Sequence, residues 1–339
     1  MNKHEATGRP SSPIIDAEEA QGLMASGWAA ADLHVHTLHS YDVIPTRATD
    51  PLRLYHEARR LGMTFVAFTD HDTMDAYDRI GWTREGLVPA VEIKIHDPKR
   101  VGHTVHVNVY TLDRNQFREI LRIARSARDI EMLTDYLKGE SLPFVFNHPF
   151  WHEAGEKINL QAVLEISDLF PVLEYNMGRI ARLNSQALRL AEAKGKGIAA
   201  ATDTHVGEIA RAFTVAPGET FGEFFESIGR GQARIVPADL TLARLKGETR
   251  TRLKQLFDKA GWISAKDSLT IDTGIALLDR VVTRMAKTQL WQMGRTDRLL
   301  ERLLAAVSRT GIPGSLYFRS QRDLADQVSG FLTGAGAAA

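Results

Sequence analysis

Apolar positions between residues 29 and 240 form short runs separated by segments of helical spacing. In the intervening segments, apolar residues recur at intervals of three and four, which predicts helices over 50–63, 114–138 and 184–197. Strands that alternate with helices indicate a mainly parallel sheet, open or closed into a barrel, with its ligand site at the carboxyl ends of the strands. The runs rich in β-forming residues predict buried strands at 30–36, 64–71, 87–95, 103–112, 142–149, 172–176 and 197–205.

The pattern changes after about residue 240, where helix-like segments over 242–257, 275–293 and 298–310 follow one another with few strand signals. We therefore expect an α/β domain over 29–239 and a helical C-terminal region over 240–333. Residues 1–28 are expected to be a loose leader carrying a short helix, and 334–339 a disordered tail.

Composition restricts the chemistry of any site. The chain has 339 residues, enough for one large domain or two, and it contains no cysteine. Disulfides and thiolate metal ligands are therefore excluded, so a metal site would have to use imidazole and carboxylate groups. Net charge is zero, but residues 240–339 hold 16 Lys and Arg against 9 Asp and Glu. This basic excess either meets a polyanion or lies on solvated helix faces.

The sequence predicts no contact with membranes. It has no run of eighteen apolar residues, and its first residues lack the apolar core of a signal peptide. We expect a cytoplasmic protein, and the sequence leaves its oligomeric state open.

Histidines and acids gather at the ends of six predicted strands. His34 and His36 are two residues apart, so on a strand both point to one face, and Asp203 and His205 repeat this spacing. A lone strand histidine is more often a hydrogen-bonded core or surface residue, but burying so many unpartnered groups would cost about 1–3 kcal/mol each. Divalent cations would remove that cost; the donor types suit zinc, manganese or iron better than magnesium. The other four strands contribute Asp70, His71, Glu92, His106 and His148.

These motifs together resemble the PHP family, the polymerase and histidinol phosphatase domain. The matching segments are "DLHVHTLHSYD", "FTDHDT", "VEI", "HVNVY", "FNHPF" and "ATDTHVGEIARAFT", which span residues 31 to about 215. The resemblance implies a distorted seven-stranded (β/α) barrel of TIM-like form, here with a C-terminal helical appendage. It also implies a trinuclear metal centre at the carboxyl ends of the strands and the hydrolysis of phosphate esters.

The resemblance further implies which residues hold the metals, with Glu92 bridging two of them. Asp70 would orient His71 or the next ligand. His106 is preferred to His103 because of its strand phase. The implied ligands are His34, His36, Glu92 and Asp203 for a first metal, Glu92, His106 and His148 for a second, and Asp42, His71 and His205 for a third.

Four residues near the motifs have open roles. His39 matches no usual ligand position and is a candidate proton donor, substrate contact or solvent-facing residue. His152 has the same three interpretations, of which the solvent-facing one is preferred. Arg179 and Arg211 follow strand ends and are candidates to clamp a phosphate, although each is equally compatible with a surface arginine.

The hypothesis is direct attack on a phosphomonoester by a metal-bridging hydroxide. Two or three divalent ions would supply the hydroxide near neutral pH, bind phosphoryl oxygens and stabilise charge, so no protein nucleophile is required. His39, Asp70 and Arg211 are the candidate catalytic residues, with His39 or another protonated group assisting the leaving alkoxide. The expected partner is a small phosphorylated substrate.

Three other functions stay open. A nuclease or nucleotide phosphatase acting on nucleic-acid ends would use the basic segment after residue 240, although no ladder of aromatic residues accompanies it. A barrel that binds metals without catalysis would usually have lost ligands. An amidohydrolase-like enzyme acting on a C–N bond also begins with an HxH strand, but it usually has a carbamylated lysine and does not explain "FTDHDT". The basic residues in question are Arg244, Lys246, Arg250, Arg252 and Lys254.

Overall fold

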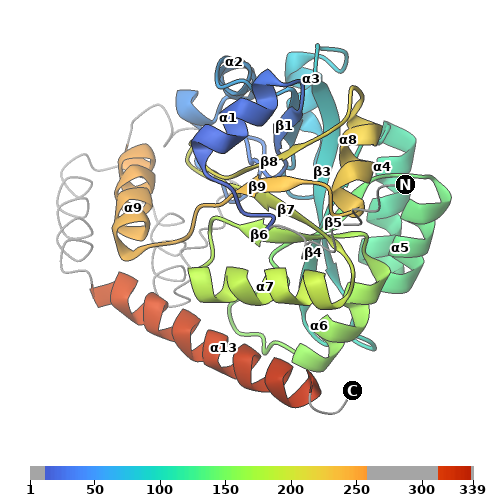
Figure 1. The fold of residues 1–339 in the computed structure, drawn as a ribbon, viewed down its shortest axis with the longest axis vertical. Helices are drawn as coiled ribbons and strands as arrows, with labels where there is room; N and C mark the ends of the chain where they lie inside the picture. Colours follow the sequence, from blue (N-terminus) through green and yellow to red (C-terminus); the bar gives the residue numbers. More distant parts are fainter. Residues whose placement is uncertain (1–11, 258–311, 337–339) are drawn as a thin grey trace, which may run out of the picture.

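The computed structural model describes residues 12–257 and 312–336, which form nine strands surrounded by helices (Figure 1). The strands are β1 (Ala29–Asp32), β2 (Phe65–Phe68), β3 (Leu87–His96), β4 (Thr104–Tyr110), β5 (Phe144–Phe146), β6 (Val172–Asn176), β7 (Gly197–Ala201), β8 (Phe213–Ala216) and β9 (Arg234–Val236). The α-helices are α1 (Ala17–Ala25), α2 (Pro51–Arg60), α3 (Asp75–Ile80), α4 (Arg114–Arg122), α5 (Ile130–Gly139), α6 (Leu160–Ile166), α7 (Ala181–Ala193), α8 (Phe221–Gly229), α9 (Leu242–Phe257) and α13 (Ile312–Gly336). Short helical turns η1 (Arg47–Thr49), η2 (Ile123–Ala127) and η3 (Ser167–Leu169) complete the described elements.

The strands form one sheet in the order β7-β6-β5-β4-β3-β2-β1-β8-β9. The predicted α/β barrel is confirmed, but it has nine strands in place of seven, and the sheet is mixed. β1, β2 and β3 are parallel neighbours, as are β5, β6 and β7, whereas β4, β8 and β9 pair antiparallel with their neighbours. β3 and β4 form a hairpin, and a hairpin needs no crossover helix.

The sheet curves so that the segment after β1 lies beside the segment after β7. Asp203 N donates to His34 O at 2.8 Å, and His36 N donates to Thr204 O at 3.2 Å. These bonds form a parallel bridge between the segments after β1 and β7, and β7 also contacts β8 and β9 at the other end of the order, so the barrel is nearly closed. Closure brings the histidine pair after β1 beside the acid after β7.

The side chain of Asp32 fastens this closure. Its carboxylate accepts hydrogen bonds from Thr202 N at 3.0 Å, Thr202 Oγ1 at 2.6 Å and Ala210 N at 2.9 Å. Burial raises the pKa of Asp32 to about 6, although these donors favour its charged form. Asp32 therefore acts within the framework that positions the mouth of the barrel.

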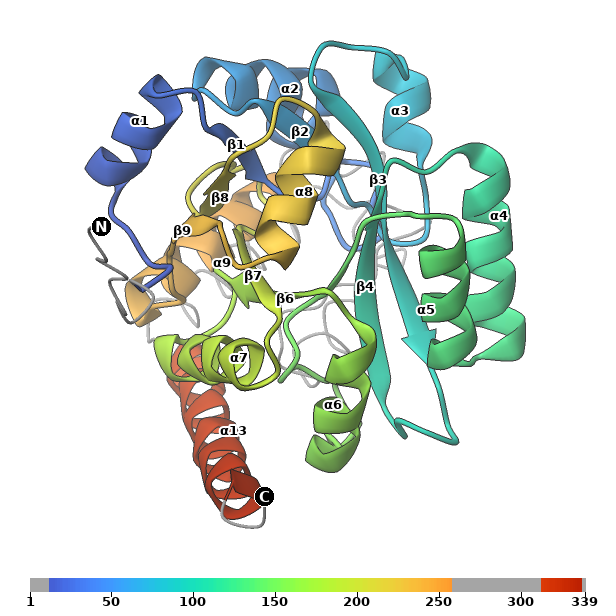
Figure 2. The same ribbon diagram turned by 45° about the vertical axis from the view of Figure 1, so that its right-hand side comes forward.

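Side-chain alternation divides the barrel interior into an apolar floor and a polar mouth. On β3, Val88 and Ala90 belong to the interior apolar cluster and are followed two residues later by Glu92. On β7, Ala199 belongs to the same cluster, and Asp203 follows at the same phase. Helix α8 lies across one end of the barrel (Figure 2), and its Phe221, Phe224 and Phe225 belong to the interior apolar cluster. The titratable groups therefore lie at the opposite end, which we call the mouth.

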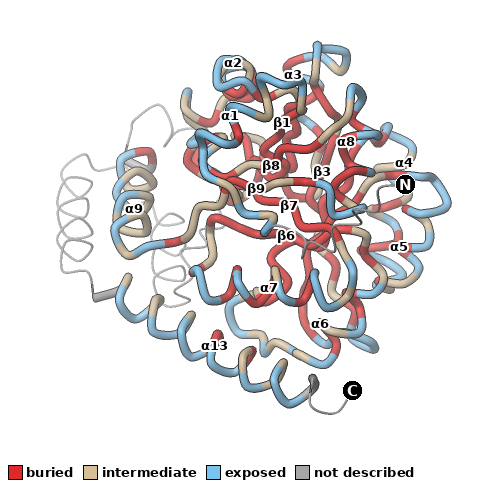
Figure 3. Tube along the Cα trace, viewed as in Figure 1, coloured by how far each residue is buried: buried red, intermediate tan, exposed pale blue. Residues whose placement is uncertain are grey.

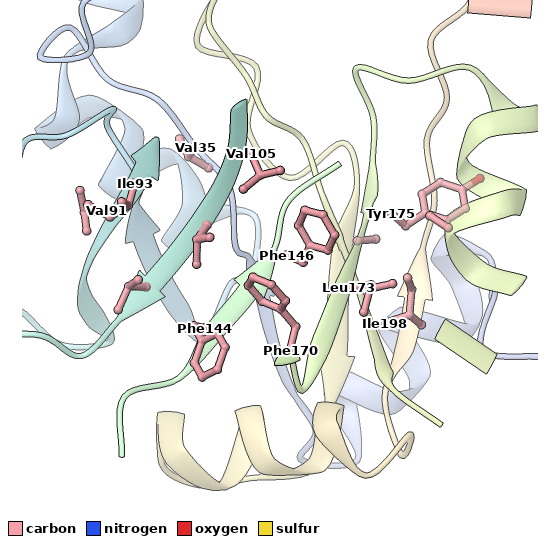
Figure 4. Close-up of a cluster of buried hydrophobic side chains, with 14 of the residues drawn as sticks. Val35, Val91, Ile93, Val105, Phe144, Phe146, Phe170, Leu173, Tyr175 and Ile198 are labelled. Carbon is pink, nitrogen blue, oxygen red and sulfur yellow. The ribbon is translucent and has the colours of Figure 1, made fainter. Parts of the chain in front are cut away.

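A second apolar layer lies between the strands and the outer helices, and most strand residues are buried (Figure 3). Phe146 of β5 stacks on Phe170 with ring centroids 4.8 Å apart, and Leu173 and Ile198 continue the layer (Figure 4). This apolar packing holds the strands in place from the outside of the barrel. The polar groups at the mouth provide no comparable packing.

Tyr77 of α3 joins β2 to β3 through its hydroxyl, which is fully buried. The hydroxyl donates toward Phe68 O and Val88 O, each at 2.8 Å, and accepts from Phe68 N and Ala90 N, each at 2.9 Å. We expect Tyr77→Phe to lower the free energy of unfolding by about 1–3 kcal/mol, because buried backbone groups lose a partner. Urea denaturation measures this. Tyr55→Phe, which removes one bond to Glu85 O, is the control and should cost less.

The C-terminal region packs against the barrel through two helices. Leu324, Ala325 and Val328 of α13 are buried in the main apolar core, and α13 contacts α7 (Figure 1). Two of the predicted C-terminal helices, over 275–293 and 298–310, lie outside the described residues. α13 includes residues 334–336, which the sequence assigned to the tail. The division of the chain into separate domains stays a prediction.

Within the ranges that the structure describes, no helix has both the length and the apolar character needed to cross a membrane.

Candidate metal centre

The structure gathers all nine predicted ligands into one cluster at the mouth. They come from segments that follow β1, β2, β5 and β7 and from the strands β3 and β4. Most are buried, and His34 and His36 are fully so. The members of this nine-residue cluster are His34, His36, Asp42, His71, Glu92, His106, His148, Asp203 and His205.

Glu92 lies at the centre of the cluster, with imidazole nitrogens around both of its oxygens. Because it points inward from β3, histidines from five different positions of the chain approach it. A carboxylate with neighbours on both oxygens has the arrangement of a bridging ligand. The distances are 3.1 Å from Oε2 to His34 Nε2, 3.2 Å to His36 Nε2 and 3.1 Å to His71 Nδ1, and 3.0 Å from Oε1 to His106 Nδ1 and 3.5 Å to His148 Nε2.

Two aspartates complete the side of the cluster away from β4. Asp203 Oδ1 lies 3.2 Å from His36 Nε2. Asp42 Oδ2 lies 2.7 Å from His205 Nε2 and 3.3 Å from His71 Nε2. Three overlapping sets in the described residues have ligand atoms close enough to hold one ion each: His36, Asp42, His71 and His205; His34, His36 and Glu92; and His71, Glu92 and His106.

The hydrogen-bonding state of the cluster fits divalent cations. His34 Nδ1 donates to Glu174 Oε1 at 2.7 Å, which leaves the lone pair of Nε2 facing His36 Nε2 at 3.1 Å and the carboxylate of Glu92. In addition, His106 Nε2 is buried without a hydrogen-bond partner among the described residues. Acceptors facing acceptors in a buried site require protons or cations between them, and these donor types suit zinc, manganese or iron.

Electrostatics in the cluster favour positive charge. Burial disfavours charged rings, yet Glu92, Asp203 and Glu174 hold the pKa of His34 well above its usual range, and contacts with Asp203 and Glu92 raise that of His36 to about 10. Burial likewise opposes ionised carboxyls, but the histidines hold the pKa values of Asp42, Glu92 and Asp203 well below their usual range. Cations would replace the protons on these rings.

We therefore expect metal binding to release protons. Without metal, His34 and His36 keep their protons at neutral pH because their pKa values are raised, whereas a ligand nitrogen must be free of its proton. Mn²⁺ binding at pH 7 should release on the order of one or two protons per chain, and affinity should rise with pH. Calorimetric titration in buffers of different ionisation enthalpy counts these protons; heats that do not vary with the buffer would contradict the expectation.

Glu174 is a member of the site that the sequence analysis did not single out. It is buried on β6, where Oε1 accepts from His34 Nδ1 and Oε2 accepts from His148 N at 2.8 Å and Asn176 Nδ2 at 2.9 Å. It therefore fixes the ring orientation of one predicted ligand and the backbone of another. The available signal was its position in the middle of the short strand "VLEYN", the only predicted strand from which no side chain was chosen.

Asp70 lies beside the cluster but acts on a different neighbour from the one expected. Its carboxylate accepts from Thr37 N at 2.6 Å and from Thr37 Oγ1 at 2.7 Å, while the ring of His71 faces Asp42 and Glu92. Thr37 directly follows His36, so Asp70 fixes the backbone at the end of the HxH segment.

Two of the cluster residues have left-handed backbone. His148 has φ of 28° and Asp203 has φ of 50°. Such conformations cost of order 1–3 kcal/mol in residues other than glycine and persist where the surroundings enforce them. The bond from His148 N to Glu174 and the bond from Asp203 N to His34 O supply that enforcement.

The remaining predicted residues are not part of the cluster. His39 is partly buried, and its Nε2 has no hydrogen-bond partner. His103 Nδ1 contacts Val101 O, away from Glu92, and His152 Nδ1 contacts the adjacent Glu153 O.

The two arginines differ. Arg179 lies with its guanidinium 5.8 Å from the centre of the Trp151 ring, which itself packs against His106 and His148 of the cluster. Arg211 is exposed and lies 3.9 Å from Glu208. Only Arg179 therefore adjoins the wall of the mouth.

Several solved structures are similar to this chain at low sequence identity. PsfC from Pseudomonas syringae has 18% identity and a TM-score of 0.45, with 62% of this chain and 92% of that chain covered. A two-domain protein from Bacteroides vulgatus, described as containing a predicted PHP-like metal-dependent phosphoesterase, has 16% identity and a TM-score of 0.43, with 62% and 66% covered. The lesion-specific endonuclease EndoQ from Pyrococcus furiosus has 15% identity and a TM-score of 0.41, with 61% and 57% covered.

No family model matches the chain, and no curated protein matches it.

Proposed function

We propose that this chain is a metal-dependent phosphoesterase that hydrolyses a phosphate monoester. The observation that carries the proposal is the overlap of three ion-sized donor sets in one buried cluster, with Glu92 in two of them. Overlapping sets place their ions side by side, as in metal-dependent phosphoryl hydrolysis. The family resemblance of the motifs supports the same reaction.

When bound, two or three divalent ions would lower the pKa of a water molecule, bind phosphoryl oxygens and offset charge on the attacking and leaving oxygens. The protein's own groups prepare this chemistry. Glu174 holds His34 in the tautomer whose Nε2 is free, and Asp70 holds the backbone after His36. The buried position of the histidines excludes bulk water from the ligand atoms.

Residues near the cluster would bind the phosphate of the substrate and protonate its leaving group. Arg179, whose Nε is buried without a hydrogen-bond partner, is the arginine better placed to bind phosphate at the mouth. His39, with its unpartnered Nε2, stays the proposed proton donor to the leaving alkoxide. Arg211 is exposed beside Glu208, and among the described residues no contact of its side chain supports a catalytic role.

The test is an assay of purified protein on 4-nitrophenyl phosphate and a panel of nucleotides and sugar phosphates, with elemental analysis. Activity should disappear with a chelator, return with Mn²⁺, and be lost in His34→Ala and Asp203→Ala. Turnover by both variants at the wild-type rate would refute the proposal. Metal binding without turnover on the whole panel would favour a non-catalytic barrel, and salt-dependent cleavage of oligonucleotide ends would favour the nuclease alternative.

A cytoplasmic location and a small phosphorylated substrate stay part of the proposal.

A further inference from the structure

Helix α9 lies at the mouth of the barrel, where both of its ends contact loops that follow barrel strands. Near its start, Arg244 Nη1 contacts Met177 Sδ, in the residue directly after β6. Near its end, Gln255 Nε2 donates to Val206 O at 3.3 Å and lies 3.5 Å from Thr46 Oγ1. These contacts lie at the carboxyl ends of β6, β7 and β1, which is the end that holds the nine-residue cluster.

The reach of α9 is sufficient to cross this end of the barrel. Eleven residues separate Arg244 from Gln255, which corresponds to about 16 Å along a helix. The loop contacted by Gln255 carries His205 immediately before Val206, and Thr46 follows the segment that carries Asp42. Helix α9 therefore passes from the β6 side of the mouth to the loops of two predicted ligands.

Polar residues of α9 face the mouth. Arg244, Glu248, Arg252 and Gln255 fall within about 80° of one another around the helix, and we call them the inward face. Gln255 is buried and the other three are partly buried, whereas Arg250 on the opposite side is exposed. An ordinary amphipathic helix would turn apolar residues to the protein and charges to solvent.

The apolar side of α9 packs elsewhere. A Cβ placed on Gly314 of α13 would lie 3.3 Å from Leu242 Cδ1 and 3.5 Å from Leu245 Cδ2, so the two helices approach closely there. α13 in turn is anchored on the barrel core through Val328 and its neighbours. Because the leucines of α9 pack against α13, the polar residues of the inward face are turned toward the mouth.

Glu248 lies one helical turn from Arg244 and one from Arg252 on the inward face. Burial raises the pKa of the Glu248 carboxyl, against the opposing charges of Arg252, Arg244 and His205. A carboxylate flanked by two guanidinium groups offers donors and acceptors together. That combination complements alcohols with several hydroxyl groups, because each hydroxyl both donates and accepts hydrogen bonds.

We propose that α9 is the specificity element of this site, and that its inward face binds the alcohol part of the phosphate ester and selects polar, hydroxyl-bearing alcohols such as polyols and sugars. This inference rests on the proposed function and names its substrate class. Arg244, Glu248 and Arg252 are the residues that would contact the hydroxyls, and Gln255 fastens the helix to the loops of the mouth.

The test uses two phosphonates, whose C–P bond resists hydrolysis, so binding is measured apart from turnover. Calorimetric titration compares 3,4-dihydroxybutylphosphonate with butylphosphonate on full-length, Mn²⁺-loaded protein. We expect wild type to prefer the dihydroxy probe by about tenfold or more, the size of a charge-assisted hydrogen bond. Arg252→Ala and Glu248→Gln should reduce this preference to nearly one, whereas Arg250→Ala, two residues away on the exposed side, should keep it.

Equal affinity of wild type for the two probes would overturn the inference, and so would an unchanged preference in both inward-face variants. Melting temperatures within a few degrees of wild type show that a variant has folded. The comparison of the two phosphonates on the wild-type protein does not depend on the folding of any variant. Failure of the proposed function gives a different result, the absence of turnover on every phosphate ester while phosphonate binding can still be measured.

Discussion

Glu92→Gln is expected to abolish both catalysis and tight metal binding while leaving the barrel folded. Glu92 lies within 3.5 Å of five histidine nitrogens, so it is shared by two of the three donor sets. Loss of a residue that only supports a ligand typically costs 10–100-fold in metal affinity or activity. Removing the charge at the centre of the cluster should exceed this, and we expect kcat/KM to fall by about 10³-fold or more.

The measurement is metal content after gel filtration, together with turnover of 4-nitrophenyl phosphate over a range of Mn²⁺ concentrations. Glutamine keeps the size of the side chain and an oxygen for the bond from Asn147 Nδ2, which is 2.8 Å long in the wild type. Glu85→Gln, at an exposed site just before β3, is the control and should behave like wild type. Normal metal content in Glu92→Gln would remove the basis for a bridging carboxylate.

The alternation of side chains along strands was the part of the site that sequence reasoning predicted best. The preference for His106 over His103 rested on strand phase, and the structure places His106 Nδ1 3.0 Å from Glu92, with His103 bonded to Val101 O. Phase is a local property of an extended chain, so it needs no knowledge of the tertiary fold.

The pairing of the strands was predicted less well. β3 and β4 read as two independent buried strands, and the turn between them gave no strong signal, so their antiparallel hairpin was missed. β8 and β9 are three or four residues long, too short for periodicity to show, and α8 between them was missed as well. Helix α8 closes the floor at the end of the barrel opposite the cluster. The expectation of a mainly parallel, seven-stranded barrel therefore still placed the candidate ligands together at one end.

The partners of buried polar residues depend on long-range contacts and could not be read from the sequence. Asp70 follows β2, yet its bonds go to Thr37, thirty-three residues earlier. The docking of α9 is a similar case, since only its contacts with Met177 and Val206 show that its polar side faces the mouth. The sequence did indicate that this segment is basic, but not where its charges point.

Glu174→Gln is expected to weaken metal binding by about 10–100-fold, the usual effect of losing a group that orients a histidine ligand. Both carboxylate oxygens accept hydrogen bonds: Oε1 from the His34 ring and Oε2 from His148 N and Asn176 Nδ2. An amide has only one oxygen, so its NH₂ group must face a donor on one side. The chain then loses either the proton-free state of His34 Nε2 or the left-handed backbone conformation at His148.

The two outcomes can be separated by experiment. If the amide NH₂ faces His34, the ring loses its fixed tautomer and Mn²⁺ affinity falls while the unfolding transition changes little. If it faces His148 N, a buried donor is left unpaired and the protein is also destabilised, by about 1–3 kcal/mol. Equilibrium dialysis and urea denaturation measure the two effects, and Glu165→Gln, exposed on α6, is the control. Unchanged metal affinity would show that the tautomer of His34, and with it the lone pair at Nε2, does not depend on Glu174 of β6.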